Sequence, residues 1–209
     1  MQILLIAATK MEIEPFISER SKYDVLITGI GAAPAVYHLL KRLQHIQYDL
    51  VIQVGIAGSF TNEIQPGQVV LIRKDCFGDL GLEENSNLKS IFEAGFVNKD
   101  EFPFENGWLI NPHTDFLSAS IPAVNAVTVN KVSDSLLQKQ QLIQKYSPQV
   151  ESMEGAALHY VCLQEKLSFI QVRAISNYVG ENDRNKWKIN KAIANLNNML
   201  GNLVAKLDK

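Results

Sequence analysis

Short apolar runs with few polar interruptions recur along the chain, at residues 3–9, 24–30, 49–58, 68–72, 123–129 and 168–176. They are rich in β-branched residues, and their apolar positions follow one another instead of alternating with polar ones. Runs of this kind are typical of strands that are buried on both faces, as in the centre of an α/β sheet. The pattern therefore predicts a buried, mostly parallel sheet.

Helical patterns, with an apolar spacing of about 3.6 residues, separate several of these strands. They are predicted at 34–46, 134–146, 153–166 and 187–207. Pro34 suits a first helical turn, and Ser133 and Asp134 suit a helix cap. The alternation of strands and helices predicts a single α/β domain over residues 1–209, with a mixed, mostly parallel central sheet flanked by helices.

Residues 75–118 differ from the rest, because their periodicity is weak and they carry glycine, proline, asparagine and aromatic residues. We expect long loops there, at the rim of a site, and no second domain. The aromatic residues of this segment are Phe77, Phe102, Phe104 and Trp108, among others. Two interpretations of them stay open, a cover over a bound ligand or part of a dimer interface.

The net charge of the 209 residues is −2 and the pI is about 6.1. This charge gives no electrostatic reason to expect nucleic acid or a membrane surface as a partner. No stretch approaches the ~20 apolar residues of a membrane span, and the N-terminus lacks the basic region of a signal peptide. We expect a cytoplasmic protein with Cys76 and Cys162 as buried free thiols. The histidines match no metal set, so no metal or other cofactor is expected.

Three glutamates stand at the ends of predicted apolar elements. Glu12 follows the first strand, where it is either a helix N-terminal acid or a catalytic base. Glu151 and Glu154 stand where the helix at 153–166 begins. A carboxylate there stabilises the helix dipole, but Glu154 could equally accept hydrogen bonds from both hydroxyls of a ribose 2′,3′-diol.

Two glycine-containing turns and one amide add to the candidate site. GIGAAP (29–34) lacks the third glycine of a dinucleotide fingerprint, so a tight turn is the simpler interpretation. In VGIAGSF (54–60), Gly55 and Gly58 either form a turn or allow a ligand to approach the end of a strand. Asn177 ends the last strand, where it either leads into a turn or pairs with the edge of a heterocyclic base.

Taken together, these segments resemble the nucleoside phosphorylase/nucleosidase superfamily. The matching segments are AATKMEIEPF near the start, GIG at 29–31, VGIAGSF at 54–60, PGQVVLI at 66–72, VESMEGAALHYVC at 150–162 and VRAISNYVGENDRNKW at 172–187. The resemblance is to the methylthioadenosine/S-adenosylhomocysteine nucleosidases and, more closely, to the futalosine hydrolases. It implies a nucleoside phosphorylase-like fold and a nucleosidase that acts on a small nucleoside. We also expect a homodimer or a higher homo-oligomer.

The resemblance further implies roles for individual residues. Glu12 resembles the base that activates the attacking water, and Met153 and Glu154 resemble a ribose clamp. Arg173 resembles the arginine that supports the site from the last strand. The residues expected to line the sugar and the base are Gly55, Ala57, Gly58 and Val132.

Asn177 stands where the adenosine-type nucleosidases have an aspartate. Adenine presents N7 beside an N6 donor, and a carboxyl group fits that edge. Hypoxanthine presents N7 beside the acceptor O6, which repels a carboxylate but accepts a hydrogen bond from an amide. Asn177 therefore favours a 6-oxopurine. The resemblance then implies hydrolysis of futalosine to hypoxanthine and dehypoxanthine futalosine, in menaquinone biosynthesis.

Three other functions stay open: a methylthioadenosine/S-adenosylhomocysteine nucleosidase, a purine nucleoside phosphorylase and a purine-binding module without activity. Asn177 disfavours the first. The turns at 7–14, 29–34 and 54–60 contain no arginine for phosphate, which disfavours the second. A module that only binds would not require Glu12. Because an amide cannot protonate a leaving base, the proton donor is unassigned, and Asp183 is interpreted as a helix cap in preference to that donor.

Overall fold

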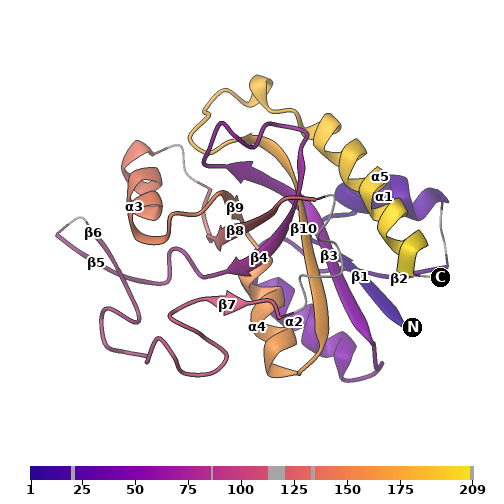
Figure 1. The fold of residues 1–209 in the computed structure, drawn as a ribbon, viewed down its shortest axis with the longest axis horizontal. Coiled ribbons are helices and arrows are strands. Elements are labelled where there is room, and N and C mark those ends of the chain that lie inside the picture. The colour runs from indigo at the N-terminus through magenta and orange to yellow at the C-terminus, as the bar shows by residue number, and fades with distance from the viewer. Residues whose placement is uncertain (20–21, 86, 113–120, 133–134, 208–209) are drawn as a thin grey trace.

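A mixed β-sheet forms the centre of the chain in the computed structural model (Figure 1). The structure describes residues 1–209 except 20–21, 86, 113–120, 133–134 and 208–209. The strands of the main sheet are β1 (Ile3–Ala7), β2 (Asp24–Ile27), β3 (Leu50–Ser59), β4 (Val69–Asp75), β7 (Leu109–Ile110), β8 (Ala123–Thr128), β9 (Val150–Ser152) and β10 (Ser168–Tyr178). They run in the order β10-β4-β8-β9-β3-β1-β2, with β7 paired to β4.

The long strands β3 and β10 dominate this sheet and pair with each other in parallel. The pairs β1–β2, β1–β3, β4–β8 and β8–β9 are also parallel, whereas β4–β10, β3–β9 and β4–β7 are antiparallel. Because β10 pairs with both β3 and β4, the strands β10, β4, β8, β9 and β3 close into a ring. Buried apolar side chains from all five strands pack together, as expected inside such a ring. The predicted mixed, mostly parallel sheet is confirmed.

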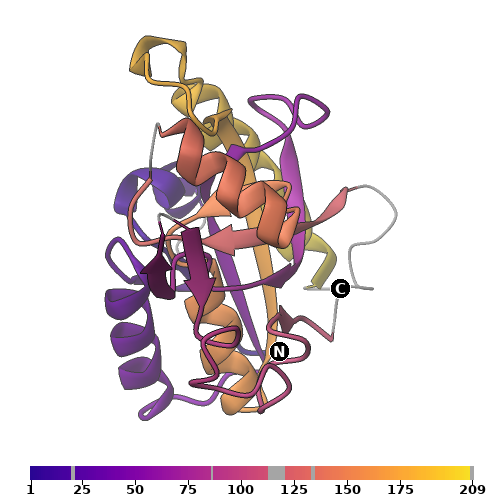
Figure 2. The same ribbon diagram turned by 90° about the vertical axis from the view of Figure 1, so that its left-hand side faces the viewer.

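Helices cover the two faces of the sheet. They are α1 (Lys10–Glu19), α2 (Ala32–Leu43), α3 (Leu136–Tyr146), α4 (Gly155–Gln164) and α5 (Ile189–Leu207). Alternate residues of β3 point to opposite faces, so Ile52 packs with α1 and α5 while Val51 packs with α2 and α4. Figures 1 and 2 place α3 and the hairpin of β5 (Gly81–Glu84) and β6 (Asn87–Ser90) at one end, away from α1 and α5.

Three local expectations need correction. The sequence pattern did not predict α1, because Pro15 interrupts it and its buried residues are few. The segment 75–118 is not loop alone, since β5, β6 and β7 lie within it. Ser135, whose side chain accepts a hydrogen bond from the Gln138 backbone N–H, caps α3, whereas Ser133 and Asp134 lie outside the described residues.

The structure also shows where Asp183 and the two cysteines lie. Asp183 is an exposed cap, as interpreted, but it caps the short 3₁₀ turn η2 (Arg184–Lys186) and not α5. Cys76 and Cys162 are buried and free. Within the described part of the chain, no helix is long and apolar enough to cross a membrane.

Candidate active site

The carboxylate of Glu12 is held at the open end of β3. Glu12 lies in the first turn of α1 and is buried. Its Oε2 accepts hydrogen bonds from the backbone N–H and the hydroxyl of Thr9, both at 2.9 Å. Its Oε1 accepts the backbone N–H of Ile56 at 3.0 Å. Three donors from two elements fix the position of this carboxylate, and each oxygen keeps a lone pair or an open direction for a further partner.

Asn197 of α5 holds the backbone of the helix that carries Glu12. Its Oδ1 accepts the N–H of Phe16 at 3.0 Å, and its Nδ2 donates to the carbonyl of Glu12 at 2.8 Å. In an uninterrupted α-helix these two backbone groups would pair with each other. The amide of Asn197 therefore lies between them, one residue from the helix-disturbing Pro15, and couples the position of Glu12 to α5.

Glu154 and Arg173 form a buried ion pair beside Glu12. Glu154 stands at the N-terminus of α4, and its Oε1 accepts the backbone N–H of Gly31 at 2.9 Å. Its Oε2 lies 3.5 Å from Nη1 of Arg173. A Cβ atom on Gly55 would clash with that Nη1 and lie 3.1 Å from Oε1 of Glu12. Gly55 is therefore required as glycine, because the guanidinium and the Glu12 carboxylate meet over it. We call Glu12, Glu154 and Arg173 the clamp cluster.

A chain of buried side chains supports Arg173 from behind. Its Nε donates to Oε1 of Gln171 at 3.1 Å, and its Nη2 donates to Oε1 of Gln53 at 3.0 Å. Gln171 donates in turn to Oδ2 of Asp75 at 3.1 Å, and Oδ1 of Asp75 accepts the hydroxyl of Thr128 at 3.0 Å. Burial raises the pKa of Asp75 to about 6, although these donors and the charge of Arg173 oppose the shift. This series of hydrogen bonds fixes the guanidinium of Arg173, which faces Glu154.

A second group of residues surrounds Gly58, further along β3. A register shift in β10 brings Asn177 opposite Gly58, and the antiparallel strand β9 places Glu151 opposite Gly58 from the other side. Residues directly opposite one another on neighbouring strands point to the same face, with Cβ atoms about 5 Å apart. We call Gly58, Glu151 and Asn177 the Gly58 edge.

The amide of Asn177 is oriented by its neighbours. Its Oδ1 accepts the hydroxyl of Ser176 at 2.7 Å, and its Nδ2 donates to the carbonyl of Tyr178 at 3.0 Å. A Cβ atom on Gly58 would lie 3.5 Å from Nδ2. The amide therefore presents its NH₂ group, which has a second hydrogen to donate, toward the space above Gly58.

Glu151 is the least satisfied carboxyl group of the site. It is buried, and among the described residues no hydrogen bond reaches its carboxyl oxygens. Burial raises the pKa of Glu151 to about 7, and the negative charge of Asp79 contributes. Its oxygens are not among the fully enclosed side-chain atoms of the described residues that lack a partner, so water or a ligand can reach them.

Comparison with known proteins places this arrangement in a family. The model of the phosphorylase superfamily matches residues 21–207. The chain belongs to the phosphorylase superfamily. This confirms the resemblance inferred from the sequence motifs, and the motif around Glu12 lies just before the matched range.

Relatives within the superfamily carry two different names. A futalosine hydrolase from Streptomyces coelicolor is 27% identical over 192 residues, which are 89% of this chain and 80% of that protein. A 5′-methylthioadenosine/S-adenosylhomocysteine nucleosidase from Buchnera aphidicola is 24% identical over 194 residues, 82% of this chain and 73% of that protein. The nucleosidase of Colwellia psychrerythraea, solved in complex with adenine, has the same fold, with a TM-score of 0.81 at 20% identity, 99% of this chain and 96% of that chain being covered.

The remaining residues expected in this superfamily site differ in position. Met153 is partly buried between Ser152 and Glu154, next to the clamp cluster. Ala57 packs with its methyl group among the apolar side chains inside the ring. Val132 is 46% exposed.

Several residues that build the site were missed by sequence reasoning about single positions. Gly31, interpreted as part of a tight turn, has a φ of 96° and donates its N–H to Glu154. Gln53 and Gln171 interrupt two apolar runs at positions that pair directly in the sheet. A polar residue at the same register in two adjacent buried strands is a signal that could have revealed the support for Arg173.

The aromatic residues of the segment 75–118 pack mostly within the chain. Phe77 and Phe104 both lie near Tyr160, with ring centroids 6.4 and 6.0 Å away, and Trp108 packs edge-on against Tyr146. Phe102 is 63% exposed. Neither a ligand cover nor a dimer interface is assigned by these contacts.

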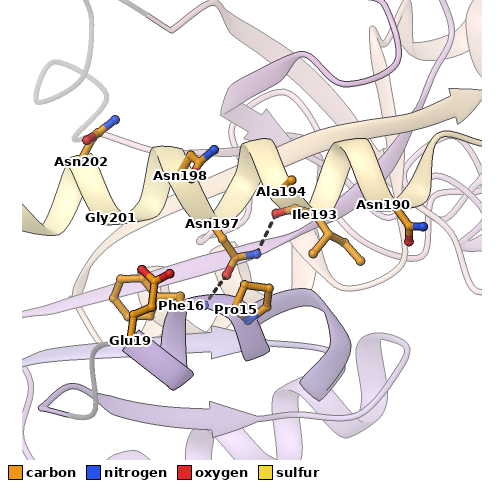
Figure 3. Close-up of a pocket in the computed structure, with 10 residues that line it drawn as sticks. All are labelled: Pro15, Phe16, Glu19, Asn190, Ile193, Ala194, Asn197, Asn198, Gly201 and Asn202. Carbon is orange, nitrogen blue, oxygen red and sulfur yellow. Dashed lines mark hydrogen bonds between the residues drawn. The ribbon is translucent and has the colours of Figure 1, made fainter.

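A hollow of about 690 Å³ lies between α1 and α5, on the outer side of these helices (Figure 3). Its lining includes Pro15, Phe16 and Asn197, but neither Glu12 nor Glu154. In Figure 3 the amide of Asn197 points toward α1, where it makes the hydrogen bonds described above. The hollow is thus separate from the carboxylates of the clamp cluster.

Proposed function

We propose that the protein is a nucleosidase that hydrolyses the N-glycosidic bond of futalosine, releasing hypoxanthine and dehypoxanthine futalosine. The reaction would serve menaquinone biosynthesis. Two features support an N-glycosyl hydrolase in general: membership of the phosphorylase superfamily and two buried carboxylates, Glu154, which pairs with Arg173, and Glu12, which lies with Arg173 over Gly55. The relatives named futalosine hydrolase and the amide at position 177 support the substrate.

The clamp cluster suits a reaction in which positive charge develops on a sugar. Cleavage of a glycosidic bond passes through a state that resembles an oxocarbenium ion. Glu154 accepts the ribose 2′- and 3′-hydroxyls through its remaining lone pairs and stabilises that charge, while Arg173 fixes its orientation. Glu12 orients the attacking water and takes its proton, which typically contributes roughly 10²–10⁴-fold to the rate.

The orientation of Asn177 is the observation that carries the choice of base. Ser176 donates to Oδ1, and Nδ2 uses one hydrogen for the carbonyl of Tyr178, so the second hydrogen of Nδ2 is left for a base. An NH₂ group donates to O6 of hypoxanthine, whereas it would face the N6 amino group of adenine as a second donor. A mismatch of this kind leaves a buried group unpaired, which is why such sites discriminate strongly.

Water is proposed as the nucleophile in preference to phosphate. The two basic residues near the relevant turns have polar partners of their own. Lys10 is exposed and pairs with Glu14 at 3.1 Å, and Arg73 donates to Asn125 at 3.2 Å. Arg173 is occupied by Gln53, Gln171 and Glu154.

A methylthioadenosine/S-adenosylhomocysteine nucleosidase is the second candidate. The relative from Buchnera aphidicola supports it at 24% identity, little below the 27% of the futalosine hydrolase from Streptomyces coelicolor. The carboxyl group of Glu151 also supports it. In its protonated form this group can donate a hydrogen bond to adenine, as the aspartate would that adenosine-type nucleosidases have in place of Asn177.

The deciding experiment incubates the purified protein with futalosine, inosine or methylthioadenosine, with and without phosphate, and measures the base released by chromatography. We expect hypoxanthine from futalosine at the highest kcat/KM, at a rate independent of phosphate. A preference for methylthioadenosine would select the second candidate. A dependence on phosphate would identify a phosphorylase, and release of no base from any substrate would favour a binding module.

A further inference from the structure

Glu151 lies inside the candidate site, yet the reaction outlined above assigns it no role. That reaction also lacks a proton donor for the leaving base, since the amide of Asn177 cannot supply one. Glu151 is only 4% exposed, and its carboxyl oxygens have no hydrogen bond within the described part of the chain. A carboxyl group without a hydrogen bond in the described part of the chain and a reaction without an assigned acid therefore coincide at the Gly58 edge.

The pairing of the strands places Glu151 on the same face of the sheet as Gly58. Along β3, Ile56 and Gly58 are partly exposed, whereas Ala57 between them is buried. Ile56 and Gly58 therefore share one face of β3, about 7 Å apart along the strand, and Ala57 lies on the other. Glu151 lies opposite Gly58 and shares its face. Ile56 binds Glu12 through its N–H, so Glu151 and Glu12 border the same stretch of strand.

Asn177 and Glu151 flank Gly58 from opposite sides. The first lies opposite Gly58 across the β3–β10 pairing and the second across the β3–β9 pairing. Gly58 between them has no side chain, and the side-chain atoms nearest to the position that a Cβ atom would take are Cγ2 of Val179 at 3.0 Å and Nδ2 of Asn177 at 3.5 Å. Asn177 presents one donor at the Gly58 edge, and a protonated Glu151 presents another.

The surroundings of Glu151 favour its neutral form near neutral pH. Burial raises the pKa of Glu151 to about 7, and Asp79 adds to the shift. The groups that face it from β3, β8 and β10 are Gly58, Val127 and Asn177, none of which carries a charge. Among the described residues, Asp79 is thus the charged group that acts on Glu151. An acid that retains its proton close to pH 7 is suited to general acid catalysis.

We propose that Glu151 is the general acid of the hydrolysis and donates its proton to N7 of the leaving purine. This inference rests on the proposed nucleosidase function. The C1′–N9 bond breaks, its electron pair stays on the base, and N7 takes the proton of Glu151. Glu12 takes a proton from the water whose oxygen bonds to C1′. Glu151 thus loses one proton and Glu12 gains one, and proton exchange with solvent returns both carboxyl groups to their starting forms. Asn177 donates to O6 beside N7.

The test compares wild type and Glu151→Gln on two substrates. Futalosine has a leaving base that needs a proton, whereas 4-nitrophenyl β-D-ribofuranoside has a leaving group that departs without one. We expect kcat on futalosine to fall at least ~100-fold in the variant. We expect the rate on the nitrophenyl riboside to change less than about threefold, because both substrates share the ribose that Glu12 and Glu154 serve.

A pH profile gives an independent readout. In wild type, kcat/KM should fall as the pH rises through about 7, because the required form of Glu151 is protonated. This alkaline fall should be absent from Glu151→Gln. In Asp79→Asn, a matched variant that removes the neighbouring negative charge, it should move to lower pH while the rate at the acidic side is kept.

Three outcomes would overturn the proposal: an equal loss on both substrates, an unchanged alkaline fall in Glu151→Gln, or full activity of that variant on futalosine. Failure of the substrate assignment looks different. If wild type releases adenine from methylthioadenosine but no hypoxanthine from futalosine, the futalosine proposal is wrong. The same comparison of Glu151→Gln with wild type is then made on methylthioadenosine.

Discussion

Buried carboxyl groups have opposite surroundings in the clamp cluster and at the Gly58 edge. Glu154 has an arginine and a backbone N–H as partners, and Glu12 has three hydrogen-bond donors. Glu151, three residues before Glu154, has a buried carboxyl group, the negative charge of Asp79 nearby and a raised pKa. Ionised carboxylates are retained in a protein interior by donors and cations, whereas a carboxyl group without them holds its proton. The contrast separates two carboxyl groups that have donors as partners from one whose pKa is raised by burial.

The sharpest way to break this contrast is Glu12→Gln. We expect kcat to fall at least ~100-fold while substrate binding is largely unchanged, because the amide cannot take a proton from water. Single-turnover and binding measurements check both parts. Glu14→Gln, on the same helix but in an exposed pair with Lys10, is the control and should stay within about twofold. Retention of more than about a tenth of wild-type activity by Glu12→Gln would contradict the assignment of Glu12 as base.

Glu154→Gln tests whether the clamp acts through its charge. Loss of the hydrogen bonds between its carboxylate and the ribose hydroxyls, about 1.5–3 kcal/mol for a charged acceptor, should lower kcat on the ribosyl substrate roughly 10–100-fold. On a 2′-deoxyribosyl substrate the loss should be smaller, because one of the two hydroxyls is missing. An equal loss on both substrates would show that Glu154 does not bind the diol.

Asn177→Asp moves the Gly58 edge toward the character of an adenosine-type site. The ratio of kcat/KM for futalosine to that for its 6-amino analogue should fall at least ~10-fold, since each frustrated hydrogen bond costs about 1–3 kcal/mol. The ribose is the same in both substrates, so the contributions of Glu12 and Glu154 cancel. If both rates fall by the same factor, Asn177 shapes only the chain toward Gly180, and the preference for the base has another origin.

The smallest expected effect is on the stability of the fold, and it tests the contrast between Glu151 and the clamp cluster without measuring activity. The pKa of Glu151 is raised from 4.5 to about 7 in the folded protein, so its ionisation destabilises the fold progressively between those pH values. At pH 8, Glu151→Gln should therefore unfold at a higher temperature than wild type, by about 1–3 kcal/mol or roughly 5 °C. The difference should shrink as the pH is lowered toward 4.5. Thermal unfolding at pH 5 and pH 8 measures it, and a variant that is no more stable at pH 8 would show that Glu151 is not strained by burial.

The sequence predicted the main architecture because uninterrupted apolar runs have few other uses than buried strands. The runs at 49–58 and 168–176 became β3 and β10, nearly within their predicted bounds. Helical spacing did not mark α1, although Glu12 was considered as a helix N-terminal acid. In the structure Asn197, far along the chain, bridges the backbone of this helix next to Pro15. A tertiary contact of this kind leaves no local periodicity.

Part of the candidate site could also be predicted from the sequence. Glu12, Glu154, Arg173 and Asn177 were singled out by residue type, by position at element ends and by family resemblance. Val132 is 46% exposed and Ala57 packs inside the ring of strands, and their expected role in lining the sugar and the base stays a prediction. A shift of one residue decides which face of a strand a side chain takes, and the register shift in β10 cannot be read from the sequence.

Order along the chain thus determined the alternation of strands and helices, the polar residues at the strand ends and the absence of an electrostatic reason to bind nucleic acid. Tertiary structure alone decided that Gly31 donates to Glu154, that Gly55 leaves space for Arg173 and Glu12, and that Glu151 and Asn177 flank Gly58. The physical reason is that burial and partners set the charge of a carboxyl group. Glu151 and Glu154 are the same residue type three positions apart, and only the fold gives one of them an arginine and the other none.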